Sequence, residues 1–418
     1  MKFRFVSISS LIIYLFPAVL ISGPFISDLI VSTLSIAFII HSIIKKLFDY
    51  FKNIFFYFFL FFWLVCILSS FFSQQFIFSI MNSLFFIRFG IFSILIYYLV
   101  KNNPNFIKNF YYTTLCTLIV LLVDAYFQKF FGVNITGNIP VTITKIHGLF
   151  GKKEILGTYL LRISPILLFI CLFQKKNINF FLIFFYVFVE PIIFYSGQRS
   201  IFYVSLIYIV CLILFVKHNR KAIAALIFLF IFLYYNLFLN KNYNHRMIKD
   251  ITVNYQMYKP YNYDVDGKYK YLNFMFYSPN QTILWITSLN IFMDNKIIGA
   301  GPNTFRYICD QYKPKIDYEH NKCSTHPHNF AFQLLAEIGL VGFMIYACAY
   351  FFLLKKIMIN LYRKIFYQEG KNLPHSALII LILINFFPLI TNGNFFNNYL
   401  SIINFLPFGF LLFLAHKK

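Results

Sequence analysis

Acidic residues are scarce in this chain. Its 418 residues include 14 Asp and Glu against 37 Lys and Arg, and charged residues of both signs make up only 12% of it. Hydrophobic residues make up 60%, and the mean hydropathy is +0.69. A water-soluble domain does not hide that much apolar surface, so the composition excludes one and indicates a protein whose solvent is the lipid bilayer.

The formal net charge of +23 does not indicate nucleic-acid binding. The basic residues fall in short clusters between apolar runs of about 17–25 residues, the length that crosses a bilayer as a helix. Backbone groups in lipid must be satisfied internally, which favours helices. We therefore predict an all-α polytopic membrane protein with about 12 transmembrane helices. The predicted spans are 6–22, 26–44, 54–72, 82–100, 110–130, 155–174, 178–196, 199–216, 222–239, 327–354, 375–391 and 398–414.

Charge separates the connections into two sets. The short connections around 23–25, 73–80 and 391–398 hold no Lys or Arg. Because basic connections remain in the cytoplasm, both termini are predicted to be cytoplasmic. The first apolar run continues through Ser22-Gly23-Pro24 into a second span, so it is interpreted as retained rather than cleaved. The opposite set holds 19 basic residues: Lys2, Arg4, Lys45, Lys46, Lys52, Lys101, Lys108, Lys175, Lys176, Lys217, Arg220, Lys221, Lys355, Lys356, Arg363, Lys364, Lys371, Lys417 and Lys418.

Three parts follow from this topology. Residues 1–239 hold nine spans, residues 240–326 form a large outer loop, and residues 327–418 hold three more spans. A loop of this length is expected to fold into a cap. Cys309 and Cys323 are the only cysteines in it, and in an oxidising compartment they would form a disulfide, with two free thiols as the alternative.

Ionisable residues inside the spans share a location. Arg88, Asp124, Arg162, Glu190 and Glu337 all fall in the half of a span nearer the outer face. A transporter would place polar groups near the midplane and along both halves of a path. One-sided polarity instead predicts a cavity open to the outer side. Alternatively, the two arginines extend to lipid headgroups or pair with Asp124 and Glu190.

Two further polar features lie at the same face. Arg199 opens the eighth predicted span, where a capping or interfacial role is the alternative to binding. Asn329, Gln333 and Glu337 are spaced four apart and therefore share one helical face. This stripe either extends a site inward or holds helices together by hydrogen bonds.

The segment from Ser324 to Asn329 has the pattern of a helix start. Thr325 or His326 would cap the helix and Pro327 would be its first residue. The positive end of a helix lowers the pKa of a nearby histidine, and a neutral His328 is what a general base requires.

Two alternatives concern the histidines. One is a metal site of His320, His326 and His328 near Asp317 and Glu319, a set that lacks a recognised ligand spacing. The other is a non-catalytic pair at the membrane interface. Upstream, the turn from Gly299 to Asn303 lacks the third glycine and the strand of a dinucleotide fingerprint, but its backbone could approach an anion.

Three stretches of the sequence resemble the O-antigen ligase and O-antigen polymerase superfamily of bacterial inner-membrane glycosyltransferases. The first is His328-Asn329-x9-Gly339-x-x-Gly342, preceded by Gly299-x-Gly301-x-x-x-Phe305. The second is the glycine-containing segment 150–162, and the third is Ser196-Gly197-Gln198-Arg199-Ser200.

The resemblance implies a helical fold like that of other lipid-carrier glycosyltransferases. It implies transfer of a glycan from an undecaprenyl-diphosphate carrier to a sugar hydroxyl at the periplasmic face, with no metal or other cofactor. His328 and Arg199 match the essential histidine and arginine of the family. A ligase uses lipid A–core as acceptor, and a polymerase uses another carrier-linked repeat.

Residue chemistry is compatible with that reaction. Arginine suits a diphosphate leaving group, and a histidine base on the opposite side of the sugar would give inversion. A ligase is the first interpretation and a polymerase the second; transfer to a protein hydroxyl and a polysaccharide flippase are the remaining alternatives. The residues predicted to bind the diphosphate or glycan are Arg88, Arg162, Arg306, Asn329, His326 and Glu337.

Overall fold

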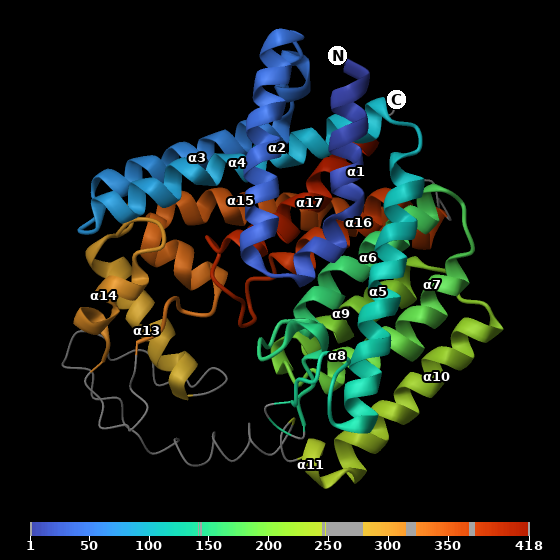
Figure 1. Cartoon of the computed structure of the whole chain (residues 1–418). Coiled ribbons are helices and arrows are strands. Elements are labelled where there is room, and N and C mark those ends of the chain that lie inside the picture. Colours follow the sequence, from blue (N-terminus) through green and yellow to red (C-terminus); the bar gives the residue numbers. More distant parts are fainter. Residues whose placement is uncertain are drawn as a thin grey trace.

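The protein is built from helices (Figure 1). A computed structural model describes residues 2–140, 142, 144–244, 247, 279–314, 323–367 and 373–416. The helices are α1 (Lys2–Ile21), α2 (Pro24–Ile44), η1 (Phe48–Phe51), α3 (Ile54–Phe71), α4 (Phe76–Asn102), α5 (Phe106–Phe131), η2 (Gly148–Phe150), α6 (Leu156–Phe173), α7 (Ile178–Phe184), η3 (Phe185–Val189), α8 (Glu190–Tyr195), α9 (Arg199–Phe215), α10 (Arg220–Tyr234), η4 (Tyr235–Leu239), α11 (Lys241–Asn244), α13 (Pro279–Asp294), α14 (Phe305–Tyr312), α15 (Phe330–Tyr367), α16 (Leu373–Asn385) and α17 (Asn398–Ala415).

The predicted all-α membrane fold is confirmed. Within the described ranges, 10 helices are long and apolar enough to cross a membrane, and α9 and α16 are shorter apolar helices. Every predicted span has a helix over its range. The count of 12 spans is not confirmed, because the 17 residues of α9 and the 13 of α16 are short for a full crossing.

Two helix ends differ from the prediction for local reasons. The eleventh span was expected to reach residue 391, but α16 ends at Asn385. Pro388 follows, and a proline restricts the residue before it to extended conformations, so the helix ends before the apolar run does. The tenth span was expected to end at residue 354, but α15 continues to Tyr367, through residues such as Lys, Met and Arg that favour helix.

The most enclosed helices form the centre of the molecule. Every residue of α6 from Leu156 to Cys171 is buried, and α4 is buried continuously from Phe89 to Val100. α17 packs along α4, and α16 packs along α6. In contrast, α1, α2, α3 and α10 keep large apolar side chains exposed, as lipid-facing helices do.

The two chain ends lie on the same side of the molecule, while α11 and α13 lie on the other (Figure 1). This arrangement has the geometry expected for termini that share a compartment. Of the basic residues used to predict the orientation, Lys371, Lys417 and Lys418 lie outside the described residues, as does most of the outer loop between α11 and α13.

The backbone of the segment before α14 crosses α15 at Gly339 and breaks this helix near its start. Gly339 has a φ of 66° inside the helix, and the freed groups pair with the turn before α14. The amide of Gly301 donates to the carbonyl of Glu337 at 2.8 Å, and the amide of Leu340 donates to the carbonyl of Lys296 at 2.8 Å. A Cβ on Gly339 would lie 2.4 Å from the carbonyl oxygen of Ile297. Contact this close requires glycine.

Substitution of Gly339 tests this crossing. Gly339→Ala adds both left-handed strain and a clash with backbone, whereas Gly132→Ala adds the strain alone, since Gly132 has a φ of +78° and open space around it. We expect Gly132→Ala to cost about 1–2 kcal/mol and Gly339→Ala to cost clearly more. Thermal unfolding of the detergent-purified full chain measures both, and equal melting temperatures would contradict the crossing.

Candidate active site

The predicted helix start is displaced by three residues. α15 begins at Phe330, and Asn329 caps it by accepting the amide of Phe332 on its side-chain oxygen at 3.2 Å. The expectation that Thr325 or His326 caps and that Pro327 opens the helix is therefore wrong. The cause is the left-handed backbone of His328, with a φ of 55°, which interrupts the helix before it can start at Pro327.

His328 is half-buried in a corner of the chain. Its Nε2 lies 3.2 Å from the hydroxyl of Ser324, and its carbonyl accepts the amide of Asn392 at 2.7 Å. The His326 ring lies beside it, with 4.1 Å between ring centroids. These contacts fix the His328 ring and its backbone together.

Burial keeps both imidazoles neutral. It lowers the pKa of His328. It lowers the pKa of His326 to about 3, with smaller contributions from the neighbouring His328 and from the charge of Arg306. A neutral histidine was predicted from the positive end of a helix, whereas in the structure the main cause is loss of water around the rings.

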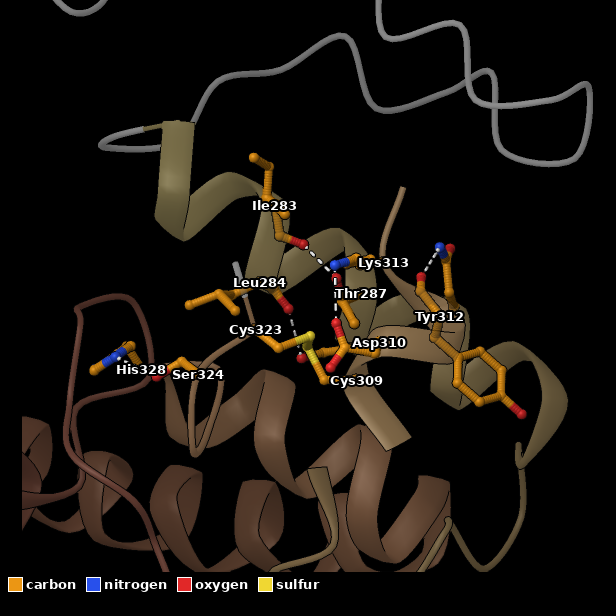
Figure 2. The surroundings of a disulfide bond; sticks show 12 residues. Ile283, Leu284, Thr287, Cys309, Asp310, Tyr312, Lys313, Cys323, Ser324 and His328 are labelled. Atoms are coloured by element: carbon orange, nitrogen blue, oxygen red, sulfur yellow. Dashed lines mark hydrogen bonds and ion pairs between the residues drawn. A yellow bond between two sulfur atoms is a disulfide. The ribbon is translucent and has the colours of Figure 1, made fainter. Parts of the chain in front are cut away.

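A disulfide anchors this corner to α14. Cys309, on α14, is bonded to Cys323, with 5.8 Å between their Cα atoms. Ser324 follows Cys323 directly and points its hydroxyl toward the His328 ring (Figure 2). The bond therefore fixes the segment that carries the hydrogen-bond neighbour of His328.

The predicted polar stripe exists and points inward. Gln333 donates to Glu337 at 2.9 Å and to Asn394 at 2.8 Å. Glu337 accepts the backbone amides of Asn303 at 2.9 Å and of Phe305 at 3.0 Å. The stripe therefore holds the turn before α14 in place by hydrogen bonds, and these bonds go to a turn and a connection rather than from one helix to another.

Asn329 is engaged in the same way. Its side-chain amide donates to the carbonyls of Pro388 at 2.8 Å and Ile390 at 3.2 Å. These residues belong to the connection 386–397 between α16 and α17. Asn329 and Glu337 were both predicted to bind substrate, yet their side chains are buried and bonded to protein backbone.

Connection 386–397 also reaches the start of α9. The hydroxyl of Ser200 hydrogen-bonds to the hydroxyl of Thr391, and the next residue, Asn392, donates its amide to His328. Consecutive residues of the connection therefore contact the start of α9 and the histidine corner. Arg199 is half-buried and forms no ion pair or hydrogen bond with the described part of the chain.

Two of the stretches that carried the resemblance pack against each other. The side-chain oxygen of Gln198 accepts the amide of Thr158 at 2.8 Å, and its amide nitrogen donates to the carbonyl of Glu154. Gly157 faces Ser196 so closely that a Cβ there would lie 2.4 Å from the serine hydroxyl. The segment 150–162 thus supports the turn that presents Arg199.

Arg306 is the exposed cation of this region. It lies on α14 and donates to the side chain of Asn303 at 3.2 Å. The same Asn303 oxygen accepts the side-chain amide of Asn394 at 2.7 Å. The charge of Arg306 contributes to lowering the pKa of His326, after burial and the neighbouring His328.

The expected ion pairs of the other two arginines are wrong. Arg88 pairs with Asp28 on α2 at 2.8 Å, and Arg162 is buried between α6 and α17, where it donates to Asn404 at 2.9 Å. Asp124 instead accepts the amide of Ile135 at 2.8 Å. Glu190 accepts the hydroxyl of Ser205 at 2.6 Å.

Sequence reasoning missed two features of the site. Asp28 was overlooked although it is an ionisable residue inside the predicted second span. The connection 386–397 was noted only for its lack of charge, although it holds asparagines at 392, 394 and 397. Side-chain amides in a short connection between apolar runs were the available signal.

The predicted metal alternative depends on His320, Asp317 and Glu319, which lie outside the described residues. Over the ranges that the structure describes, no three His, Cys, Asp or Glu side chains form a group that could hold a metal ion.

Residues 180–347 match the family model described as O-antigen ligase. Over this range the chain is similar to O-antigen ligases, in agreement with the resemblance seen in the sequence. The matched range contains Arg199, Arg306 and His328, and it ends beyond the crossing at Gly339. It leaves out Arg88 and Arg162. The comparison with curated proteins gives no match.

Glu337→Gln tests whether this carboxylate holds the turn. Glutamine has one side-chain oxygen where glutamate has two, so one of the two buried backbone amides that bond to Glu337 would lose its acceptor. We therefore expect a loss of about 1–3 kcal/mol in the free energy of unfolding. Glu154→Gln is the matched control, because Glu154 pairs with Lys145 at an exposed position and should change stability by less than about 1 kcal/mol. Equal melting temperatures for the two variants in detergent would show that the turn does not depend on Glu337.

Proposed function

We propose that this protein transfers a glycan from an undecaprenyl-diphosphate carrier to a sugar hydroxyl at the periplasmic face of the bacterial inner membrane. The acceptor is lipid A–core, so the protein acts as an O-antigen ligase. The observation that carries the proposal is the hydrogen bonding of connection 386–397 to both the neutral His328 corner and the start of α9, where Arg199 has no described partner.

His328 is proposed as the general base. An imidazole accepts a proton only when it is neutral, and burial favours that form here. The acceptor hydroxyl would give up its proton to this ring as it attacks the sugar carbon. A positioned base of this kind contributes about 10²–10⁴-fold to the rate.

Arg199 and Arg306 are proposed to stabilise the leaving diphosphate. Arginine donates pairs of hydrogen bonds that suit phosphate oxygens, and Arg199 also stands at the positive end of α9. Arg88 and Arg162 are less suited, because Asp28 neutralises the first and helix packing encloses the second. With base and diphosphate on opposite sides of the sugar, displacement is in line and inverts the anomeric carbon.

Asn329 and Glu337 are proposed as positioning residues rather than contacts to substrate. Asn329 holds connection 386–397 against the start of α15, and Glu337 holds the turn from which Arg306 projects. The orientation, with both termini cytoplasmic, is supported by the 19 basic residues at the termini and in the connections on the same side as the termini. The Cys309–Cys323 bond supports an oxidising compartment for the cap.

A polymerase that extends carrier-linked repeats would use the same residues. The acceptor distinguishes the two: a ligase transfers glycan to lipid A–core, while a polymerase joins two carrier-linked units. Purified full-length protein given a synthetic carrier-linked glycan and both acceptors would show which product forms, with EDTA added to test for a metal requirement.

Removal of either proposed catalytic side chain should abolish most transfer. We expect His328→Ala to lower kcat about 10²–10⁴-fold and Arg199→Ala to lower it about 10²–10³-fold. His218→Ala and Arg220→Ala are matched controls, since His218 lies in the connection before α10 and Arg220 begins α10, on the predicted cytoplasmic side. Transfer at near wild-type rates by correctly inserted His328→Ala or Arg199→Ala protein would refute the assignment.

The pH dependence should report the buried histidine. Because the folded pKa of His328 lies below the ordinary value of about 6.5, the base stays neutral as the pH falls to 6.5 and is lost only at lower pH. We expect kcat/KM to stay level down to about pH 6.5 and then to fall. The unfolded chain takes up this proton first, so stability also declines with falling pH, and thermal scans must accompany the profile. An acidic limb centred above pH 6.5 would contradict burial as the cause.

A further inference from the structure

A cavity of about 340 Å³ lies between α2, α4 and the start of α17. Its polar lining consists of Asp28, Ser32, Asn82, Arg88 and Asn398. The remaining lining side chains are phenylalanines and one methionine. The volume is at the small end of the range for ligand pockets.

The charges of this cavity cancel. Arg88 donates from Nε and Nη2 to one oxygen of Asp28, at 3.0 and 2.8 Å. The other Asp28 oxygen accepts the side-chain amide of Asn398 at 2.9 Å. A diphosphate would find no uncompensated cation here, so the lining favours an uncharged ligand.

Hydrogen-bonding groups nevertheless remain open. The hydroxyl of Ser32 and the side-chain oxygen of Asn398 accept or donate no hydrogen bond within the described part of the chain. Phe86, Phe89 and Phe396 stand around them. Aromatic faces with a few placed polar groups suit a sugar ring, which has apolar C–H faces and hydroxyls at its edge.

The cavity borders the surface that faces lipid. Two of its lining residues, Met81 and Phe85, are 53% and 60% exposed, and Leu29 on α2 is 54% exposed. Polar groups at such a surface are costly unless a polar partner covers them. A sugar that is attached to a lipid reaches this position from the bilayer.

We propose that this cavity binds an uncharged sugar residue of a lipid-linked glycan. The proposal rests on the function proposed above, and it names a second contact for one of the two glycan substrates. Asn82 in the cavity accepts the side-chain amide of Asn303 at 3.1 Å, and Asn303 also contacts Arg306. Phe396 belongs to connection 386–397, so two routes link the cavity to residues of the proposed active site.

Filling the cavity tests the proposal. Ser32→Leu places an apolar side chain in the space without removing the Arg88–Asp28 pair. Thr33→Leu is the matched control, because Thr33 is the next residue of α2 and its exposed hydroxyl bonds only to its own helix. Ser32→Ala removes the hydroxyl alone and serves if the larger side chain disturbs folding.

Binding is measured with the full chain in nanodiscs, one lipid at a time, so that transfer is not needed. The carrier arm compares undecaprenyl-diphosphate disaccharide with undecaprenyl diphosphate. The acceptor arm compares lipid A–core with lipid A. We expect Ser32→Leu to weaken binding of one glycan-bearing lipid at least about tenfold, and Ser32→Ala about two- to tenfold. The matching lipid without the added glycan should bind as before, and Thr33→Leu should change neither.

The arm in which Ser32→Leu weakens binding identifies which lipid carries the sugar. Wild-type affinity of Ser32→Leu and Ser32→Ala in both arms would overturn the proposal, and so would equal weakening for a lipid with and without its glycan. Failure here is separable from failure of the proposed function. If transfer depends on His328 while both arms are unchanged, the cavity assignment alone fails; if glycan binding depends on Ser32 but no transfer occurs, the function alone fails.

Discussion

Backbone groups that the helices leave unpaired must find partners inside a membrane protein, and connection 386–397 shows how this chain meets that requirement. Asn329 bonds two of its carbonyls, His328 accepts one of its amides, and Gln333 accepts the amide of Phe395 at 2.8 Å. His328 and Asn329 lie just before α15, and Gln333 lies in its first turn. The same connection contacts the start of α9 through Thr391 and lines the α2–α4 cavity with Phe396.

The same principle explains why glycine, glutamate and asparagine recur near the site. Gly339 interrupts α15, and the turn before α14 supplies the hydrogen bonds that the interruption removes. Glu337 adds two acceptors to that turn. Buried polar side chains here stabilise backbone geometry, whereas the guanidinium of Arg306 is exposed and that of Arg199 is half-buried.

The positions of the helices could be predicted from the sequence because the length of an apolar run and the basic residues that flank it are local properties of the chain. The ranges of the spans were predicted on that basis, and the polar stripe of Asn329, Gln333 and Glu337 was predicted from their spacing of four residues. The disulfide could also be foreseen, since Cys309 and Cys323 are the only cysteines of the outer loop. Helix ends were less accurate at Pro388 and His328, where one residue's backbone conformation overrides the apolar pattern around it.

Tertiary partners could not be predicted in this way. Arg88 pairs with Asp28 across 60 positions of sequence, and periodicity within one span carries no information about which other span it faces. The disulfide has a further consequence for assembly. Its cysteines are 14 positions apart, on segments that precede α15, so both must be delivered to one side of the bilayer before they can join. The segment that carries Ser324, the hydrogen-bond neighbour of His328, is therefore tied to α14 only once those thiols have been oxidised on that side.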